Sequence, residues 1–231
     1  DDSESRGLGD VYKRQIMVSI LKVDKIQKPN SDSDMIVFPT TAGGNMTISN
    51  FSSGNILEKI GGLCDGSTRT TKSGVTFTLP NITAVQTLNA TSYTDVDGST
   101  ITYTAPSDCI GVMYEFLHNA AWDGTAHSIQ HYRLYLDGTE VVYGRRTIAA
   151  QYFEMKPMLQ WYFRIDSSLS SQDSNTGAIP SWTSARTMKW TSRAYAANDV
   201  ARQHGSHYWD GGGGNQFHQP QIWITAFGAS S

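Results

Sequence analysis

Short runs rich in Ile, Val, Tyr and Thr, separated by turn residues, fill the chain from residue 74 to residue 231. In the clearest run, IQHYRLYL, Tyr132, Leu134 and Leu136 fall on one side and His131, Arg133 and Tyr135 on the other. This period of two predicts a half-buried β-strand. Asp137-Gly138 and the run TEVVY follow, so we expect a β-hairpin with a type I′ turn, because both central residues of that turn need positive φ.

Further runs of this kind lie at residues 75–79, 82–89, 99–104, 109–118, 147–155, 158–165, 186–195 and 221–228. The run 109–118 has no breaker except Gly111, which predicts a central strand. The last run is apolar on both faces, with Ile222 and Ile224 opposite Trp223 and Phe227. Such a strand is either central or buried in an interface. Long helical segments do not separate the runs, so residues 74–231 are predicted to form an all-β domain, an antiparallel β-sandwich or jelly roll.

Residues 17–73 have a different pattern. Short strand-like runs, MIVF and MTI, are interrupted by Pro39 and Gly43-Gly44, and the segment is too short and broken to bury a core of its own. We therefore expect an extended N-terminal arm that attaches to another surface or trimerises with copies of itself. Residues 54–65 have apolar positions near helical spacing, broken at Gly61-Gly62, so we expect a short helix there, with a strand as the alternative.

The first sixteen residues differ again. They begin DDSESRGLGDVYKRQ, and the ending DVYKRQ resembles translated sequencing-adapter read-through. A genuine polar, disordered arm is the alternative. Residues 1–16 are therefore left out of the fold prediction.

Composition and charge narrow the classes of partner. The formal net charge of -3 gives no broad electrostatic footprint for nucleic acid. No apolar run approaches the roughly 18 residues of a membrane-spanning helix, so we expect no membrane insertion. Cys64 and Cys109 are expected to be two buried free thiols rather than one disulfide, because the chain is not a small cysteine-rich scaffold.

Two aromatic loops are the candidate ligand-binding sites. The loop 119–128 carries Trp122 and Asp123, and the glycine-rich segment 208–220 is flanked by Tyr208, Trp209 and Phe217. Aromatic side chains on polar loops can stack on sugar rings or anchor a partner. The alternative is that they close the end of the core.

Catalytic and metal sites have weaker support in the sequence. The chain has no G-x-S-x-G and no H-E-x-x-H motif, and we expect no cofactor. Glu115 lies inside an apolar run and is expected to pair with an arginine such as Arg133 on a neighbouring strand; one carboxylate of a glycosidase pair is the alternative. The weak candidate metal ligands are His127, His131, His204 and His207. Loop and surface histidines without a metal are the alternative.

Several phrases of the sequence resemble those of known viral proteins. The opening SILKVDKIQ…MIVFPTTAGGNMTI resembles the module that starts many tail-fibre-like structural proteins of marine phages and large algal viruses. The phrases SYTDVDGSTITYTAPSDCIGVMYEF, HYRLYLDGTEV and HYWDGGGGNQFHQPQIWITAFG resemble the C-terminal domain that follows this module. The resemblance implies a virion protein, a trimer, and a head similar to the C1q/tumour-necrosis-factor jelly roll. The long repetitive shaft of a full fibre is missing from this sequence.

The sequence thus favours a non-enzymatic virion structural protein, such as a fibre tip or decoration protein, that binds a host-surface glycan or receptor through loops. Its expected partners are its own copies, as a homotrimer, and other virion proteins. Two alternatives stay open. One is a carbohydrate-active enzyme or metal-dependent lectin, and the other is a purely architectural capsid protein without a ligand.

Overall fold

The computed structural model describes residues 25–27, 34–37, 47–48, 55–71, 74–122, 128–150, 154–197, 199–206 and 216–228. The chain divides into two compact units, residues 1–52 with Ser231, and residues 53–230. In the first unit, the described residues form an antiparallel sheet of three short strands, β1 (Lys25–Gln27), β2 (Asp34–Val37) and β3 (Thr47–Ile48), in that order. The runs MIVF and MTI of the sequence therefore contribute strands, as their composition predicts.

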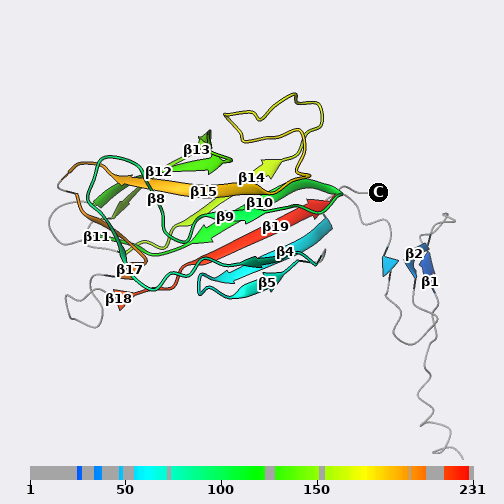
Figure 1. The fold of residues 1–231 in the computed structure, drawn as a ribbon, viewed down its shortest axis with the longest axis horizontal. Coiled ribbons are helices and arrows are strands. Elements are labelled where there is room, and N and C mark those ends of the chain that lie inside the picture. Colours follow the sequence, from blue (N-terminus) through cyan, green and yellow to red (C-terminus); the bar gives the residue numbers. More distant parts are fainter. Residues whose placement is uncertain are drawn as a thin grey trace, which may run out of the picture. The chain divides into compact units, whose positions relative to one another are not determined.

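The second unit is built on two antiparallel sheets (Figure 1). The order of the first sheet is β14 (Met158–Arg164), β10 (Cys109–Leu117), β19 (Gln221–Gly228) and β4 (Asn55–Leu63). The order of the second is β13 (Thr139–Ala150), β12 (Ser128–Leu136), β15 (Arg186–Ala194) and β8 (Thr94–Asp95), and β9 (Ile101–Tyr103) also pairs with β15.

The strand order identifies the fold as a jelly roll. If β4, β9, β10, β12, β13, β14, β15 and β19 are counted from one to eight along the chain, the first sheet has the order 6-3-8-1 and the second 5-4-7-2. Strands that are distant in sequence are thus neighbours in each sheet, as in the double Greek key of a jelly roll. This confirms the all-β sandwich that the sequence predicts.

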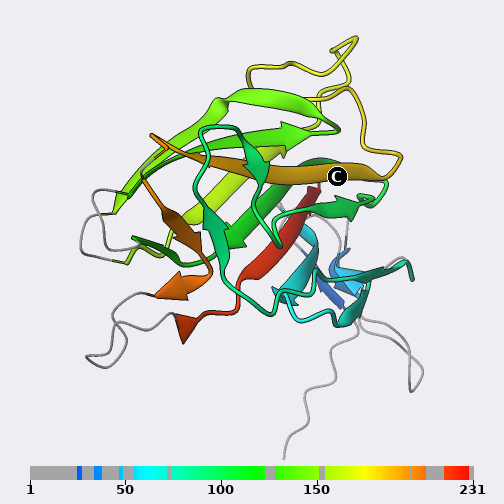
Figure 2. The ribbon, with the colours of Figure 1, turned by 60° about the vertical axis from the view of Figure 1, so that its left-hand side comes forward.

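The core lies between the two sheets, which face each other in Figure 2. Val112, Tyr114 and Phe116 point inward from β10 and are fully buried. The opposite sheet contributes an equivalent inward row, Tyr132, Leu134, Leu136, Met188 and Trp190. Each row follows the period of two of its strand, so the alternation in the sequence determines which side chains are buried.

Smaller strand groups gather at the end of the sandwich where β10 finishes. β11 (Ala120–Trp122), β16 (Ala201–Gln203) and β7 (Gln86–Leu88) form one sheet, and β17 (Gly205–Ser206) pairs with β18 (Gln216–Phe217). β11 also contacts β17. β5 (Thr68–Thr70) and β6 (Thr76–Thr78) form a separate hairpin. The described part of the chain contains no helix long and apolar enough to cross a membrane.

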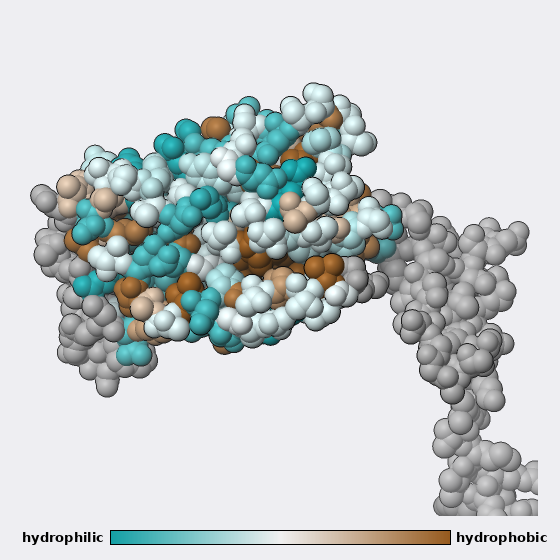
Figure 3. Space-filling model, in the orientation of Figure 1, coloured by the Kyte–Doolittle hydropathy of each residue, from teal (hydrophilic) through white to brown (hydrophobic). Residues whose placement is uncertain are grey.

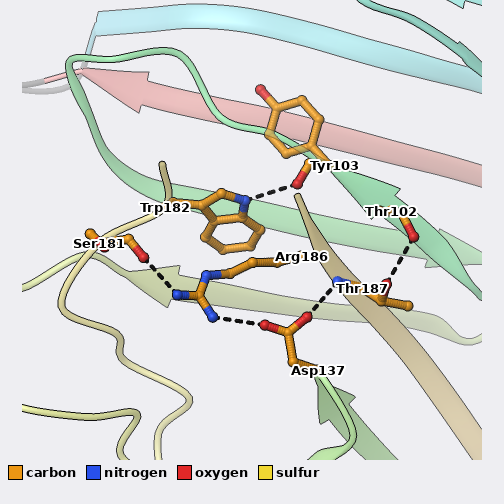
Figure 4. A network of polar contacts seen from close by, with 7 residues as sticks. All are labelled: Thr102, Tyr103, Asp137, Ser181, Trp182, Arg186 and Thr187. Carbon is orange, nitrogen blue, oxygen red and sulfur yellow. Dashed lines mark hydrogen bonds and ion pairs between the residues drawn. The ribbon is translucent and has the colours of Figure 1, made fainter. Parts of the chain in front are cut away.

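The predicted hairpin is present, with Asp137 and Gly138 between β12 and β13 at φ 49° and 80°. Figure 4 shows how the side chain of Asp137 joins this turn to β15. The Asp137 carboxylate accepts a hydrogen bond from the Thr187 amide at 2.8 Å and pairs with the Arg186 guanidinium at 2.7 Å. Arg186 donates in turn to the carbonyl of Ser181 at 3.0 Å. One aspartate thus holds a turn, a strand and a loop together.

Other sequence expectations are confirmed. β10 is a central strand between β14 and β19, and β19 lies between β10 and β4. Cys64 and Cys109 are both buried free thiols. One face of the second unit, shown in Figure 3, mixes hydrophobic and hydrophilic residues, so the core does not take up every apolar side chain.

Three expectations differ from the structure. The short helix expected at residues 54–65 is wrong, because this segment is the edge strand β4 paired with β19. The boundary between the compact units lies after Ser52 rather than after residue 73, because β4 belongs to the jelly roll. The pair Glu115–Arg133 is also wrong, since the two residues lie in different sheets. Arg133 instead lies 3.4 Å from Glu140 on the adjacent strand β13.

Candidate functional site

The predicted aromatic loops leave neighbouring strands at one end of the jelly roll. β11 ends at Trp122, and β17, which it contacts, ends at Ser206 before the glycine-rich segment. Asp123, Tyr208 and Trp209 lie outside the described residues, and so does the Trp122 side chain. Phe217 is half-buried on β18, where its backbone pairs with Gly205. The starting points of both loops are therefore brought together, as a joint binding surface requires.

The candidate metal ligands do not form a described metal centre. His127 and His207 lie outside the described residues. His131 is half-buried on β12, its Nδ1 lies 3.0 Å from Thr147 Oγ1, and partial burial followed by the charge of Arg193 lowers its pKa. Within the described ranges, no group of three or more His, Cys, Asp or Glu side chains could hold a metal ion.

His204 instead belongs to a buried polar cluster at the same end of the molecule. The other members are His118, directly after β10, Gln130 and Tyr132 on β12, and Gln203 on β16. The rings of His118 and His204 lie 5.7 Å apart, and His118 Nε2 lies 3.3 Å from Tyr132 Oη. The Tyr132 hydroxyl donates to Gln130 Oε1 and lies 3.1 Å from Gln203 Oε1, while Gln203 Nε2 donates to Gln130 Oε1. We name these five residues the buried polar cluster.

Burial keeps both histidines of the cluster neutral. Burial, and then the nearby His204, lowers the pKa of His118 to about 3. Burial also lowers the pKa of His204 to about 4. Because a charged imidazole loses its hydration here, neither ring is protonated near neutral pH.

The backbone at His204 is held in an unusual conformation. Its φ is 63°, in the left-handed region that costs a non-glycine residue roughly 1–2 kcal/mol. Two hydrogen bonds maintain it: the His204 amide donates to the carbonyl of Asn119 at 2.7 Å, and the His218 amide donates to the carbonyl of His204 at 2.8 Å. This bend therefore joins the ends of β10, β16 and β18.

A pocket of about 220 Å³ opens beside the cluster. Its wall consists of Leu117, His118, Asn119, Lys156, His218, Gln219 and Gln221. Gln219 is fixed by hydrogen bonds from its amide to the carbonyls of Cys64 and Ile82, the latter at 2.9 Å. The wall thus contains one cation, two imidazoles and three amide side chains, which suits a small polar ligand. We call it the terminal pocket.

A second pocket, of about 330 Å³, lies at the opposite end of β10. Cys109, Pro106, Pro180 and Trp182 are among its lining residues, and none of the lining residues is charged. Burial raises the pKa of the Cys109 thiol, so this cysteine is not an activated nucleophile.

The outer face of the sheet β14-β10-β19-β4 carries several large apolar side chains. Its residues lie opposite the inward rows and include Ile56, Leu63, Met113, Leu117, Met158, Tyr162, Trp223 and Phe227. Ile56 and Met158 are 60% and 51% exposed. The rings of Tyr162 and Phe227 meet edge to face at 5.9 Å, and Lys59 Nζ lies 5.5 Å from the ring of Trp223. We call this surface the apolar sheet face.

The inward positions of the cluster could have been predicted, but its composition could not. His118 continues the inward row of Phe116, and Gln130 continues that of Tyr132, so their parity along the strands was the available signal. No such signal exists for Gln203, on the short strand β16 that is placed by its pairing with β11, or for His204, which directly follows this strand.

Comparisons with known proteins add little to this geometry. No family model matches the chain, and no curated protein matches it significantly. Among solved structures, a chain from the crystal structure of the T13 IBDV viral particle is 14% identical with a TM-score of 0.21. That alignment covers 80% of this chain and 44% of the other, so the present chain spans less than half of its length. A TM-score this low carries no argument about function.

Proposed function

We propose that this protein is a non-enzymatic structural protein of a virion, which self-associates through the apolar sheet face and binds a host-surface glycan at the loop end. The observation that carries the proposal is the apolar sheet face. The tail-fibre-like phrases of the sequence supply the viral context, and the jelly roll is the head architecture that this resemblance implies.

Exposure of this face is costly for an isolated chain. Its large side chains sit side by side across four strands, whereas monomers rarely expose contiguous apolar patches beyond a few hundred Å². Closed symmetry is the usual way in which copies of one chain bury such a surface. We therefore propose a homotrimer in which each apolar sheet face is turned toward the other copies.

Charge at the face favours copies of the same chain over an unrelated apolar partner. Glu115 lies near its middle, in register with Gln160 and Trp223, and Lys59 lies beside Trp223. Arg164, at the end of β14, lies on the same face, so acidic and basic groups are present there that can pair between copies related by rotation.

The proposal is tested by the mass of the full chain in solution, measured by light scattering. We expect about 76 kDa, three times the 25.4 kDa of one chain. The double substitution Ile56→Lys and Met158→Lys places charges on exposed positions of the face and should give a folded monomer. Tyr143→Lys is the matched control, because Tyr143 is 62% exposed on β13 of the other sheet.

A monomeric wild-type chain would contradict the assembly half of the proposal, and so would a doubly substituted chain that keeps the wild-type mass. The binding half is tested with host cells or their polysaccharide, where Trp122→Ala, Trp209→Ala and Phe217→Ala should reduce retention. Sugar released from the polysaccharide by the wild-type protein would instead support the enzyme alternative.

A further inference from the structure

Basic side chains gather on the outer face of the second sheet. His131 and Arg133 alternate with the buried residues of β12, so they point away from the core. Arg193 of β15 is in register with His131. Thr147 of β13 is in register with His131 on the other side, and Arg145 precedes it by two residues. Three neighbouring strands thus place three arginines and a histidine on one face, across two strand spacings of roughly 10 Å in all. We call these four residues the basic face.

Carboxylates do not neutralise the basic face. Glu140 lies 3.4 Å from Arg133 and 2.6 Å from Arg145, so one carboxylate serves two guanidinium groups. Arg193 forms no ion pair with any described carboxylate, and its Nη1 donates to two backbone carbonyls at 3.0 and 3.3 Å. Three arginines and one glutamate leave an excess of two positive charges, in a chain whose formal net charge is -3.

Two of the arginines are held by the same aromatic ring. The guanidinium of Arg133 lies 4.1 Å from the centre of the Tyr93 ring, and that of Arg193 lies 5.5 Å from it. Side chains that are already ordered lose less entropy when a ligand binds, so these two cations are prepared for binding. Further along the sheet, Lys189 and Asp95 pair at 2.8 Å and add no net charge.

The basic face is accessible to a large ligand. The side chains of Arg133 and Arg145 are 34% and 55% exposed. Tyr195, directly after β15, is 57% exposed, and its ring lies 5.9 Å from that of His131. Guanidinium groups bind sulfate and carboxylate with charge-assisted hydrogen bonds, and an exposed aromatic ring can stack on a sugar ring. The two kinds of group together are complementary to a sugar polymer that carries negative charge.

We propose that the basic face binds an anionic polysaccharide, with Arg133 and Arg193 donating to its sulfate or carboxylate groups and Tyr195 stacking on a sugar ring. This inference rests on the proposed glycan-binding function and specifies the ligand class. Charge density favours a polysaccharide over nucleic acid. Duplex DNA carries one negative charge per about 1.7 Å, whereas the basic face offers an excess of two positive charges over roughly 10 Å.

The position of the basic face fits binding at the loop end. The loop that carries Trp122 leads into β12 at Ser128, three residues before His131. On the neighbouring strand, the Tyr195 amide donates to the carbonyl of Ile129 at 2.8 Å. His131 and Tyr195 thus lie at the end of the sheet where the Trp122 loop arrives. A polysaccharide on the basic face would continue toward the aromatic loops.

The test measures binding of the full chain to immobilised dextran sulfate, polygalacturonate and unmodified dextran by surface plasmon resonance. We expect an anionic polymer to bind at least tenfold more tightly than dextran, and the two anionic polymers distinguish sulfate from carboxylate recognition. Salt should abolish this binding, because the screening length falls from about 10 Å at 0.1 M to about 3 Å at 1 M.

Variants assign the binding to the basic face. Arg193→Gln should weaken it at least tenfold, the loss expected for one charge-assisted hydrogen bond, and Arg193→Lys should weaken it less because the charge is kept. Lys25→Gln removes the same charge from β1 of the first unit and should leave the affinity unchanged. Thermal unfolding at the wild-type temperature verifies that each variant is folded.

Equal affinity for dextran and the anionic polymers, or a folded Arg193→Gln variant with unaltered affinity, would overturn the inference. Duplex DNA that binds more tightly than both polymers at the same salt would also overturn it, in favour of a nucleic-acid partner. The same holds for a loss of oligomer mass in Arg193→Gln, because the basic face would then be an interface between copies.

Retention on host polysaccharide is measured in parallel and separates this inference from the proposed function. Retention that Arg193→Gln does not alter would reject the basic face while leaving the proposed function intact. A wild-type chain that is neither retained nor self-associated would reject the proposed function itself.

Discussion

The two neutral histidines of the buried polar cluster make stability depend on pH. His118 and His204 have folded-state pKa values of about 3 and about 4, both below the ordinary value of 6.5. The unfolded chain therefore binds protons that the folded chain does not. The stabilisation is complete above pH 6.5 and is lost as the pH falls toward 4 for His204 and toward 3 for His118.

The size of this loss follows from the pKa differences. Between pH 6.5 and pH 4.5 each histidine removes about 2 kcal/mol from the free energy of unfolding, because one pKa unit corresponds to about 1.4 kcal/mol. The two together remove about 4–5 kcal/mol, a large part of the roughly 5–15 kcal/mol that stabilises a domain. Carboxyl groups with lowered pKa, such as that of Asp173 beside Thr176, titrate mainly below this window.

The assay is urea unfolding of the full chain at pH 6.5, 5.5 and 4.5, compared with the variant His118→Gln. The variant should lose about half as much stability over this range as the wild type, whatever its stability at pH 6.5. His131→Gln is the control. It should change the dependence of the free energy of unfolding on pH less than His118→Gln does, since His131 is only half-buried. A wild-type free energy of unfolding that varies by less than about 1 kcal/mol from pH 6.5 to 4.5 would refute the reasoning.

Four further substitutions, at three positions, test the packing of the jelly roll by thermal and urea unfolding. Gly61→Ala would place a Cβ 2.2 Å from the carbonyl oxygen of Ile222, so it should destabilise the protein by about 3 kcal/mol or more. Gly138→Ala, where a Cβ meets nothing within 4 Å, should cost only about 1 kcal/mol; equal losses would contradict the clash. Asp137→Ala should cost about 2 kcal/mol, because the turn loses its contacts to Arg186 and to the neighbouring strand. Asp137→Asn keeps a residue that tolerates positive φ and should cost less than half of that; an equal loss would assign the effect to the ion pair alone.

Strand identity could be predicted from the sequence wherever one face of a strand is buried. The alternation in β12, the Asp137-Gly138 turn and the two apolar faces of β19 all predict the observed structure. The edge strand β4 could not be predicted this way. Its apolar residues fit helical spacing as well, and only the pairing with β19, which is distant in sequence, determines its conformation.

The order of the strands in each sheet could not be predicted from any short run of the sequence either. β4 and β19 lie at opposite ends of the second unit's sequence, and their pairing depends on the whole chain path rather than on any short run. The same limit applies to the candidate site. The aromatic residues of the two loops are evident in the sequence, whereas the terminal pocket consists of a lysine, histidines and amides from segments that only the fold brings together.

The inward row of β10 explains why the site lies at this end of the molecule. Val112, Tyr114 and Phe116 pack in the core, and His118 takes the next inward position, where the facing strand offers Gln130 and Tyr132 instead of another apolar pair. A polar row at this depth needs hydrogen-bond partners, and the cluster supplies them for Tyr132 and both glutamines but leaves Nδ1 of His118 and both ring nitrogens of His204 without one among the described residues. The core thus ends in the hydrogen-bonded residues of the buried polar cluster. The apolar core can therefore end here without an unpaired strand end, because these hydrogen bonds join β10, β12 and β16 across it.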